Sequence, residues 1–531
     1  MPSARSATKT ARAAPAAGRE TWQEQAASFV GFFVFLLVLK TFFLPLFIIP
    51  TGSMAETLYG QHTLHTCPNC GFEYAVGWIA PGRWPFNTPF IQCPNCRWRQ
   101  YSAREAQLLR SRGQPIVADE IIESLPSMAG DRIFVHGWPY DPLFRRVPGL
   151  GPRRWDVVVF RVPTDGDTNY IKRLIGLPGE KIEIIDGDVF VNDRLEAKPA
   201  GAQQSLWFPY FSQDYVPRRP SVASQYHPRW EPQTQPTGWS DPAQRVLRFD
   251  GADRTRDELL FVTVPGNPRV PGEIIDLYGY NELRKPDRIV PDVRLSAEVE
   301  FDGAVTGYLE LALEVDRHAF TARLAPDGRL TLQHSWTGPQ GPRDERRETR
   351  VALAGPARIE LYHVDGRAAV AVNGATLSAD GYELTPDAAR ARARGRSSPR
   401  LRIAAEQTRL ALRHLRIDRD VYYTGDQIVS PQGPGIGVDG HPVTLGADEY
   451  FLLGDNSPNS QDGRYAFWHT GLEWVGPHLK RALAEGRYQL GTVPGDQLIG
   501  PAFFVYWPGF LPLGPDRLTI LPDLGRLRWI R

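Results

Sequence analysis

Three short segments of this 531-residue sequence carry side chains that could do chemistry together. Ser53 follows an apolar run, Lys172 lies in the strand-like stretch 170–175, and a loop rich in Asp, Asn and Ser covers 454–464. A serine hydroxyl becomes a nucleophile when a base takes its proton, and a buried lysine can be that base because burial lowers the pKa of its amine. Each segment taken singly is more often a turn, a solvated strand or a surface loop.

A second group of reactive side chains consists of two Cys-Pro-Asn-Cys turns that hold the four cysteines of the chain, Cys67, Cys70, Cys93 and Cys96. Four thiolates with this spacing bind zinc tetrahedrally, and such a site leaves no open position for catalysis. The alternative is a pair of disulfide bonds, which an oxidising compartment would permit. The repeated turn favours structural zinc.

The elements that position these groups begin with a membrane anchor. The chain turns apolar from Ala26 to Leu39, and this run, with Trp22 and Lys40 as interfacial anchors, predicts a transmembrane helix over 22–40 after a basic tail, 1–21. Basic residues before the span predict a cytoplasmic N-terminus. A cleaved signal peptide would have a shorter apolar run and a small-x-small site soon after it, which is absent here. Pro45 and Pro50 predict an extended chain over 41–50.

Composition narrows the class of protein. The 61 Lys and Arg balance the 60 Asp and Glu, so net charge gives no attraction to nucleic acid. The 47 Pro and 49 Gly are typical of a chain rich in strands and loops, and the length allows three or four domains.

The order of the motifs resembles that of bacterial type I signal peptidases, membrane-bound serine endopeptidases that remove signal peptides from exported preproteins. An anchor leads into Pro-Thr-Gly-Ser-Met at 50–54, followed by Gly-Asp-x-x-x-Val at 130–135. Tyr-Ile-Lys-Arg-x-x-Gly-x-Pro-Gly-Glu follows at 170–180, and Gly-Asp-Asn-x-x-x-Ser-x-Asp-Gly-Arg at 454–464. The resemblance covers about half of the chain, around 25–60, 125–195 and 418–510.

The resemblance implies a role for each matching residue. Ser53 would be the nucleophile, Lys172 the general base, Ser460 the group that orients the lysine amine, and Thr51 a hydroxyl of the oxyanion hole together with the Ser53 N–H. The acidic loop would support these groups through four further residues, the ion pair of Asp462 with Arg464 and the structural side chains Asp455 and Asn456.

The sequence departs from the family pattern at three positions. Gly463 stands where the family usually has Ser, Glu180 where it has Asp, and Gly137 where a Lys is common. None of these changes removes a catalytic group, although they affect the fine geometry.

The domain organisation follows from these matches. We predict a mainly β fold, with a discontinuous catalytic domain over 41–62, 125–200 and 418–531 and a zinc-ribbon-like insertion over 63–104. A second insertion over 201–417 would hold an irregular linker, 201–255, and an antiparallel β-sandwich that resembles a concanavalin-like jelly roll. Alternating runs separated by Asp-Gly and Asn-Gly turns predict that sandwich. Within this insertion, 390–396 is expected to be a solvated Arg-rich loop, and within the last catalytic segment 474–486 is expected to be an amphipathic helix.

The predicted function is therefore a signal peptidase of the bacterial inner membrane, with an extracytoplasmic catalytic domain, which cuts preproteins after small-x-small sites. It needs no catalytic cofactor. Its partners would be signal peptides, the export machinery, the bilayer and a carbohydrate or protein ligand of the sandwich, but not nucleic acid. The candidates for the lipid-facing surface are Phe42, Phe43, Phe47, Trp507 and Phe510.

Two alternatives to this function are a self-cleaving repressor-type Ser/Lys protein, which should have a DNA-binding motif and no anchor, and an inactive membrane-tethered binding protein.

Overall fold

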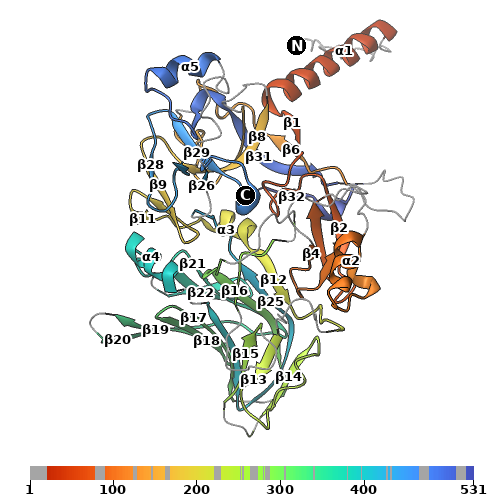
Figure 1. Cartoon of the computed structure of the whole chain (residues 1–531), viewed down its shortest axis with the longest axis vertical. Helices are drawn as coiled ribbons and strands as arrows, with labels where there is room; N and C mark the ends of the chain where they lie inside the picture. The colour runs from red at the N-terminus through yellow and green to blue at the C-terminus, as the bar shows by residue number, and fades with distance from the viewer. Residues whose placement is uncertain are drawn as a thin grey trace, which may run out of the picture.

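The computed structural model of the chain is shown in Figure 1 and is mainly β, as the sequence predicts. The sheet formed by β8 (Asn169–Gly176), β29 (Glu449–Leu453), β31 (Leu498–Trp507) and their neighbours lies near the N-terminal helix, and the sandwich sheets lie at the opposite end of the long axis. The structure describes residues 21–77, 90–122, 128–144, 147–161, 168–219, 229–251, 253, 256–263, 273–278, 280, 288–303, 306–338, 341–379, 381–395, 398–425, 429–430, 433–465, 477–509 and 522–530. The basic tail up to residue 20 and Phe510 fall outside these ranges.

The N-terminal helix projects from the rest of the molecule (Figure 1). Helix α1 (Trp22–Val38) begins at Thr21, which forms a capping box with Glu24, and η1 (Leu39–Phe43) continues it with π-helical turns. Together they make a 22-residue apolar helix with a mean hydropathy of 2.1, and no residue of it is buried in the protein. At 1.5 Å per residue it is about 33 Å long, enough to cross a bilayer. The helix runs on to Phe43 instead of stopping at Lys40, because Pro45 restricts only the residue before it.

An eight-stranded sheet brings together segments that are far apart in the sequence. Its neighbouring strands pair antiparallel, and its order places the lysine-bearing strand β8 between β7 and the strand β29 that leads into the polar loop. Its strands, in spatial order, are β1 (Leu46–Ile48), β6 (Arg132–Val135), β31 (Leu498–Trp507), β7 (Val157–Arg161), β8 (Asn169–Gly176), β29 (Glu449–Leu453) and β30 (Val493–Pro494), with β32 (Arg528–Trp529) paired to β31.

A four-stranded sheet packs beside it, and the two share an apolar core that includes Ile175, Ile182 and Phe451. Its strands are β11 (Arg194–Leu195), β10 (Asp188–Val191), β9 (Lys181–Ile185) and β28 (Val443–Thr444). The amphipathic helix expected over 474–486 is α5 (Pro477–Ala484), and 474–476 lie outside the described residues.

The cysteine turns each join the two strands of a small hairpin. One turn connects β2 (His62–Thr66) with β3 (Glu73–Gly77), and the other connects β4 (Phe90–Gln92) with β5 (Arg99–Tyr101). Helix α2 (Ala103–Ser111) follows, with Ser102 as its N-cap. Two facing hairpins with a Cys-x-x-Cys turn each are the architecture of a zinc ribbon.

The large insertion forms two packed seven-stranded antiparallel sheets. Their inward-facing apolar side chains, such as Leu295, Leu311 and Ile403, make the largest core of the molecule. One sheet contains β12 (Phe208–Ser212), β25 (Thr408–Arg419), β16 (Val293–Phe301), β21 (Ala357–Val364), β22 (Arg367–Val372), β23 (Ala375–Ser378) and β14 (Leu247–Gly251). The other contains β13 (Arg229–Pro232), β15 (Asp257–Val262), β24 (Arg400–Glu406), β17 (Tyr308–Val315), β18 (His318–Leu324), β19 (Arg329–Gly338) and β20 (Gly341–Arg350).

Two local expectations differ from the structure. The segment 201–255 is not an irregular linker, since it holds most of α3 (Ala200–Leu206) and the strands β12, β13 and β14. The alternation of apolar and polar residues in this segment is short and interrupted by Pro, so the sequence pattern does not predict strands. The strands form because they pair with β25 and β15. The Arg-rich stretch begins in helix α4 (Pro386–Gly395), where Arg392 is buried because Asp186 and Asp188 pair with it.

Candidate active site

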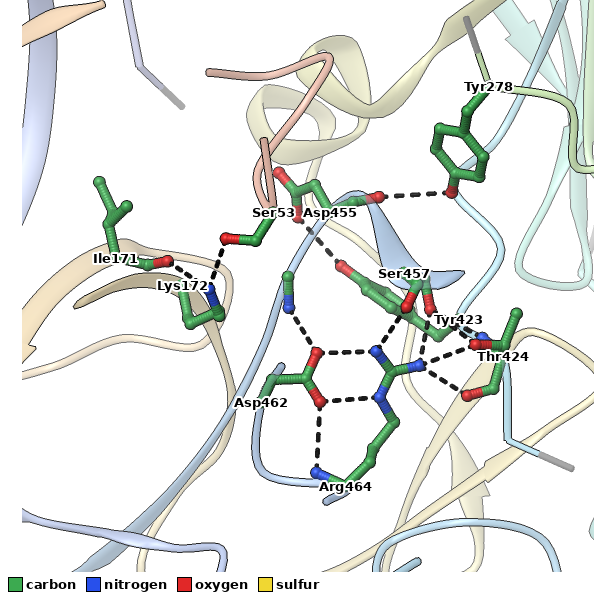
Figure 2. Close-up of polar contacts among 11 residues, drawn as sticks. Ser53, Ile171, Lys172, Tyr278, Tyr423, Thr424, Asp455, Ser457, Asp462 and Arg464 are labelled. Carbon is green, nitrogen blue, oxygen red and sulfur yellow. Dashed lines mark hydrogen bonds and ion pairs between the residues drawn. The ribbon is translucent and has the colours of Figure 1, made fainter. Parts of the chain in front are cut away.

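Ser53 and Lys172 meet at the centre of the candidate site. Ser53 lies in the turn after β1, and Lys172 lies on β8, where its side chain is buried. The distance from Lys172 Nζ to Ser53 Oγ is 2.6 Å (Figure 2). Nζ also donates to the carbonyl oxygen of Ile171 at 3.1 Å, which directs the amine along its own strand. The amine and the hydroxyl are therefore close enough to exchange a proton.

Burial changes the acid–base behaviour of Lys172. Desolvation lowers the pKa of its amine to about 8, whereas the carboxylates of Asp462 and Asp455 act in the opposite direction and Arg464 again lowers it. The net effect is a lysine whose neutral form is populated near physiological pH. A neutral amine 2.6 Å from a hydroxyl can accept its proton.

The neighbouring residue on β8 fixes the strand to the polar loop. Because side chains alternate along a strand, Arg173 points away from Lys172, and it forms a fully buried bidentate pair with Asp455 at 2.7 and 2.8 Å. Arg173 also donates to the carbonyl oxygen of Trp155. The pair therefore sets the distance between the lysine strand and the loop.

A second buried ion pair gives the loop its shape. Arg464 binds both carboxylate oxygens of Asp462 at 2.7 and 2.8 Å, and it donates to Ser457 and Thr424 (Figure 2). Asp462 accepts in addition from the backbone N–H of Gly454 at 3.0 Å. A buried charge that is paired and fully hydrogen-bonded in this way holds its surroundings rigidly.

Asn456 connects this loop to the serine turn. Its backbone N–H donates to the carbonyl oxygen of Ser53 at 3.1 Å, and its side-chain amide donates to the carbonyl oxygen of Gly52 at 3.0 Å. These two bonds hold the peptide groups on both sides of Ser53. Within the described ranges the N–H of Ser53 donates to no acceptor.

Thr51 and Ser460 lie beside the pair but do not contact the amine through a hydrogen bond. Thr51 is exposed next to the serine. Ser460 is buried, and its Oγ has no hydrogen-bond partner among the described residues. Gly454 separates it from the serine turn, since a Cβ there would lie 2.0 Å from Ser460 Oγ and 2.5 Å from the Ser53 carbonyl oxygen. The oxyanion role of Thr51 and the orienting role of Ser460 stay predictions.

The three departures from the family pattern fit the local packing. A Cβ on Gly463 would lie 2.6 Å from the ring of Phe451, and one on Gly137 would lie 2.8 Å from the carbonyl oxygen of Phe42, so a larger side chain does not fit at either position. Glu180 forms an ion pair with Arg154 at 2.6 Å. All three residues are compatible with the surrounding fold.

The four cysteines converge at one point in the ribbon. Cys67 Sγ lies 3.6 Å from Cys96 Sγ, Cys70 Sγ lies 3.7 Å from Cys93 Sγ, and all four sulfur atoms are within 4.8 Å of one another. A zinc ion with four Zn–S bonds of about 2.3 Å requires sulfur atoms about 3.8 Å apart. The cluster fits such an ion.

Several groups around the site were not assigned from the sequence. Arg173 is adjacent to Lys172 in the sequence, and this adjacency could have indicated that it lies at the site. Tyr278, Tyr423, Thr424 and Ser457 gave no such indication, because they reach the loop through contacts between segments far apart in the chain.

A serine hydroxyl in contact with a buried amine, on a β scaffold behind an apolar helix, is the arrangement of a Ser/Lys hydrolase. The family model of the signal peptidases, peptidase S26, matches residues 123–219 and 369–507. Together with the relatives below, these matches show that the chain is similar to the signal peptidases, peptidase S26, over less than half of its length.

The curated relatives that match the chain are signal peptidases as well. Signal peptidase I of Rickettsia typhi is 56% identical over 54 residues, which are 10% of this chain and 20% of that protein. Signal peptidase I of Rickettsia canadensis is 54% identical over 54 residues, with the same coverage. The chain thus spans about a fifth of the length of these relatives. Among solved structures, it is similar to the carbohydrate binding module CBM66 from Bacillus subtilis, at 7% identity and a TM-score of 0.22, covering 36% of this chain and 94% of that one.

Proposed function

We propose that this chain is a membrane-anchored type I signal peptidase that cleaves signal peptides from exported preproteins. The observation that supports this most directly is the 2.6 Å contact between Ser53 Oγ and Lys172 Nζ, with an amine whose pKa burial lowers to about 8. The family match and the relatives named signal peptidase I support the same activity.

The proposed reaction proceeds in two stages. Lys172 takes the proton of Ser53 as Oγ attacks the scissile carbonyl carbon, and the Ser53 N–H, with the Thr51 hydroxyl, binds the oxyanion. The tetrahedral intermediate collapses to an ester, and the Lys172 ammonium gives its proton to the leaving amine of the mature protein. Lys172 then takes a proton from a water molecule as the water oxygen attacks the ester. The Lys172 ammonium returns this proton to Ser53 Oγ as the ester bond breaks, and the signal peptide leaves with a carboxyl group that ionises in water.

The N-terminal helix would locate this reaction at the membrane surface. Helix α1 with η1 is long and apolar enough to cross a membrane. We propose that it spans the bacterial inner membrane with the N-terminus in the cytoplasm, which puts Ser53 on the outer side, where exported chains emerge. Phe42 and Phe43, in the last turn of this helix, are exposed and would contact the lipid surface. The substrates would then be preproteins held in the same membrane by the export machinery.

The proposal is tested with full-length protein in detergent micelles and a preprotein that has an Ala-x-Ala site. We expect wild type to release a mature protein whose new N-terminus follows the second Ala, as mass spectrometry would show. Ser53→Ala should lower the rate by at least about 10³-fold. Thr444→Ala, on the edge strand β28, is a control that should cleave like wild type. Cleavage by Ser53→Ala at a comparable rate would refute the proposal.

We further propose that the four-cysteine cluster holds a structural zinc ion. The ion would be bound by Cys67, Cys70, Cys93 and Cys96, and it would fix the two hairpins of the ribbon to each other without taking part in cleavage. The sulfur distances support this, since they match the edges of a tetrahedron around zinc.

A further inference from the structure

An arm of the large insertion reaches the serine turn. Residues 273–278 and 288–290 run alongside each other, joined by the bridge between Ile275 and Ile289 and by the bond from Val290 N–H to the Ile274 carbonyl oxygen. Together with residue 280 they are called the tyrosine arm here. The arm precedes β16 of the sandwich and lies in the gap, 220–368, between the two segments that the family model matches.

Tyr280 of this arm lies directly against Gly52. A Cβ on Gly52 would be 1.7 Å from Cε1 of the tyrosine ring, so the ring occupies the space that any other residue at position 52 would need. The φ angle of Gly52 is not in the left-handed region, so the ring accounts for the glycine better than backbone conformation does. The hydroxyl of Tyr280 donates to the carbonyl oxygen of Gln61 at 2.7 Å, which ties the far end of the same turn.

The arm also holds the other side of the site. The side-chain amide of Asn456, which binds the Gly52 carbonyl oxygen, donates to the Tyr280 carbonyl oxygen at 3.4 Å. Tyr278 donates its hydroxyl to the Asp455 carbonyl oxygen at 3.3 Å (Figure 2). Arg419, at the end of β25, donates to the Leu277 carbonyl oxygen at 2.8 Å and stacks on the Tyr278 ring, which anchors the arm to the sandwich.

We propose that the tyrosine arm is part of the catalytic machinery, with Tyr280 as the residue that positions the Ser53 turn against Lys172. The inference rests on the proposed peptidase function and adds that the insertion is required for turnover. The physical reason is that Gly52 has no side chain to hold it, so packing by Tyr280 and two bonds from Asn456 fix Ser53 Oγ. A displacement of about 1 Å between reacting groups can cost about 10²-fold in rate.

The test compares variants of the full chain in a preprotein cleavage assay. Tyr280→Ala should lower kcat by about 10- to 100-fold with little change in KM, because the turn and not the substrate site is loosened. Tyr280→Phe keeps the ring and should stay within about threefold of wild type. Tyr308→Ala, a partly buried tyrosine on β17 of the sandwich, is the matched control and should be unchanged.

A double-variant comparison tests the contact itself. Gly52→Ala should be strongly impaired with Tyr280 present and should recover at least about tenfold in kcat when combined with Tyr280→Ala, since the Cβ then has space. If Tyr280→Ala does not fold, Tyr280→Leu serves in both comparisons. Wild-type kcat in the Tyr280 variant, or a Gly52→Ala defect that is the same with and without Tyr280, would overturn the inference. A wild type that cleaves no preprotein would instead overturn the proposed function.

Discussion

Lys172 is only 4% exposed, and the charges nearest to it partly offset one another. Asp462 and Asp455 favour the ammonium, but each is held in an ion pair, with Arg464 and Arg173 respectively. Desolvation therefore dominates, and the pKa of the amine falls to about 8. The same ion pairs that shape the loop thus keep two carboxylates close to the lysine without restoring its ordinary pKa.

This acid–base behaviour predicts the pH profile of cleavage. In the proposed mechanism Lys172 is a base only when neutral, so kcat/KM should rise with pH, with a midpoint near 8, and level off above it. Asp462→Asn removes a charge that favours the ammonium, and its midpoint should move to lower pH. The measurement is kcat/KM of wild type and Asp462→Asn from pH 6 to 10. A flat profile, or one that falls with pH, would contradict the base role of Lys172.

At the scale of elements, the strands that carry the site were predictable because their apolar runs end at clear turns. The run 132–136 became β6 and 170–175 became part of β8, and the sandwich strands β16, β21 and β22 also match their predicted runs. The segment 201–255 was predicted wrongly, because two of its strands, β12 and β14, pair with β25, which lies more than a hundred residues further along the chain. The prediction of a solvated loop for the Arg-rich stretch 390–396 was wrong for a similar reason, because Asp186 and Asp188 approach Arg392 only in the folded chain.

The two cysteine turns act on the chain beyond the ribbon. Asn95 accepts from the backbone N–H of Ser212 at 2.6 Å and donates to the carbonyl oxygen of Tyr215, and Asn69 makes the equivalent pair of bonds with the backbone of Arg219. Both turns therefore hold the segment 212–219, which leads from β12 into the rest of the sandwich. A metal that fixes the turns would also fix this segment.

We therefore expect one zinc ion per chain by elemental analysis. Cys93→Ser should lose it, and amide hydrogens of 212–219 should exchange faster in that variant, as hydrogen-exchange mass spectrometry would show. Ser111→Ala, at the exposed end of α2, is the control and should keep the zinc. Metal-free protein without free thiols would contradict the zinc proposal in favour of disulfide bonds.

Across the whole molecule, the sequence predicted individual elements and motifs better than the contacts between segments that are far apart in the chain. The mainly β class, the apolar N-terminal helix and the family resemblance followed from local patterns, whereas the approach of the sandwich to the active site did not. Tyr278 and Tyr280 stand in a stretch without a motif, and their contacts with Asp455 and Gly52 join segments that are 177 or more residues apart. The carbohydrate or protein ligand of the sandwich stays a prediction.

The cooperation of Ser53 with Lys172 can be measured from the preprotein cleavage rates of Ser53→Ala, Lys172→Met and the double variant. Methionine fills the lysine site without a base. If the two residues act together, each single variant and the double variant should lose about the same factor, at least about 10³-fold, because removing either group disables the other. A Lys172→Met enzyme within about tenfold of wild type, or a double variant whose loss is the product of the single losses, would contradict the account.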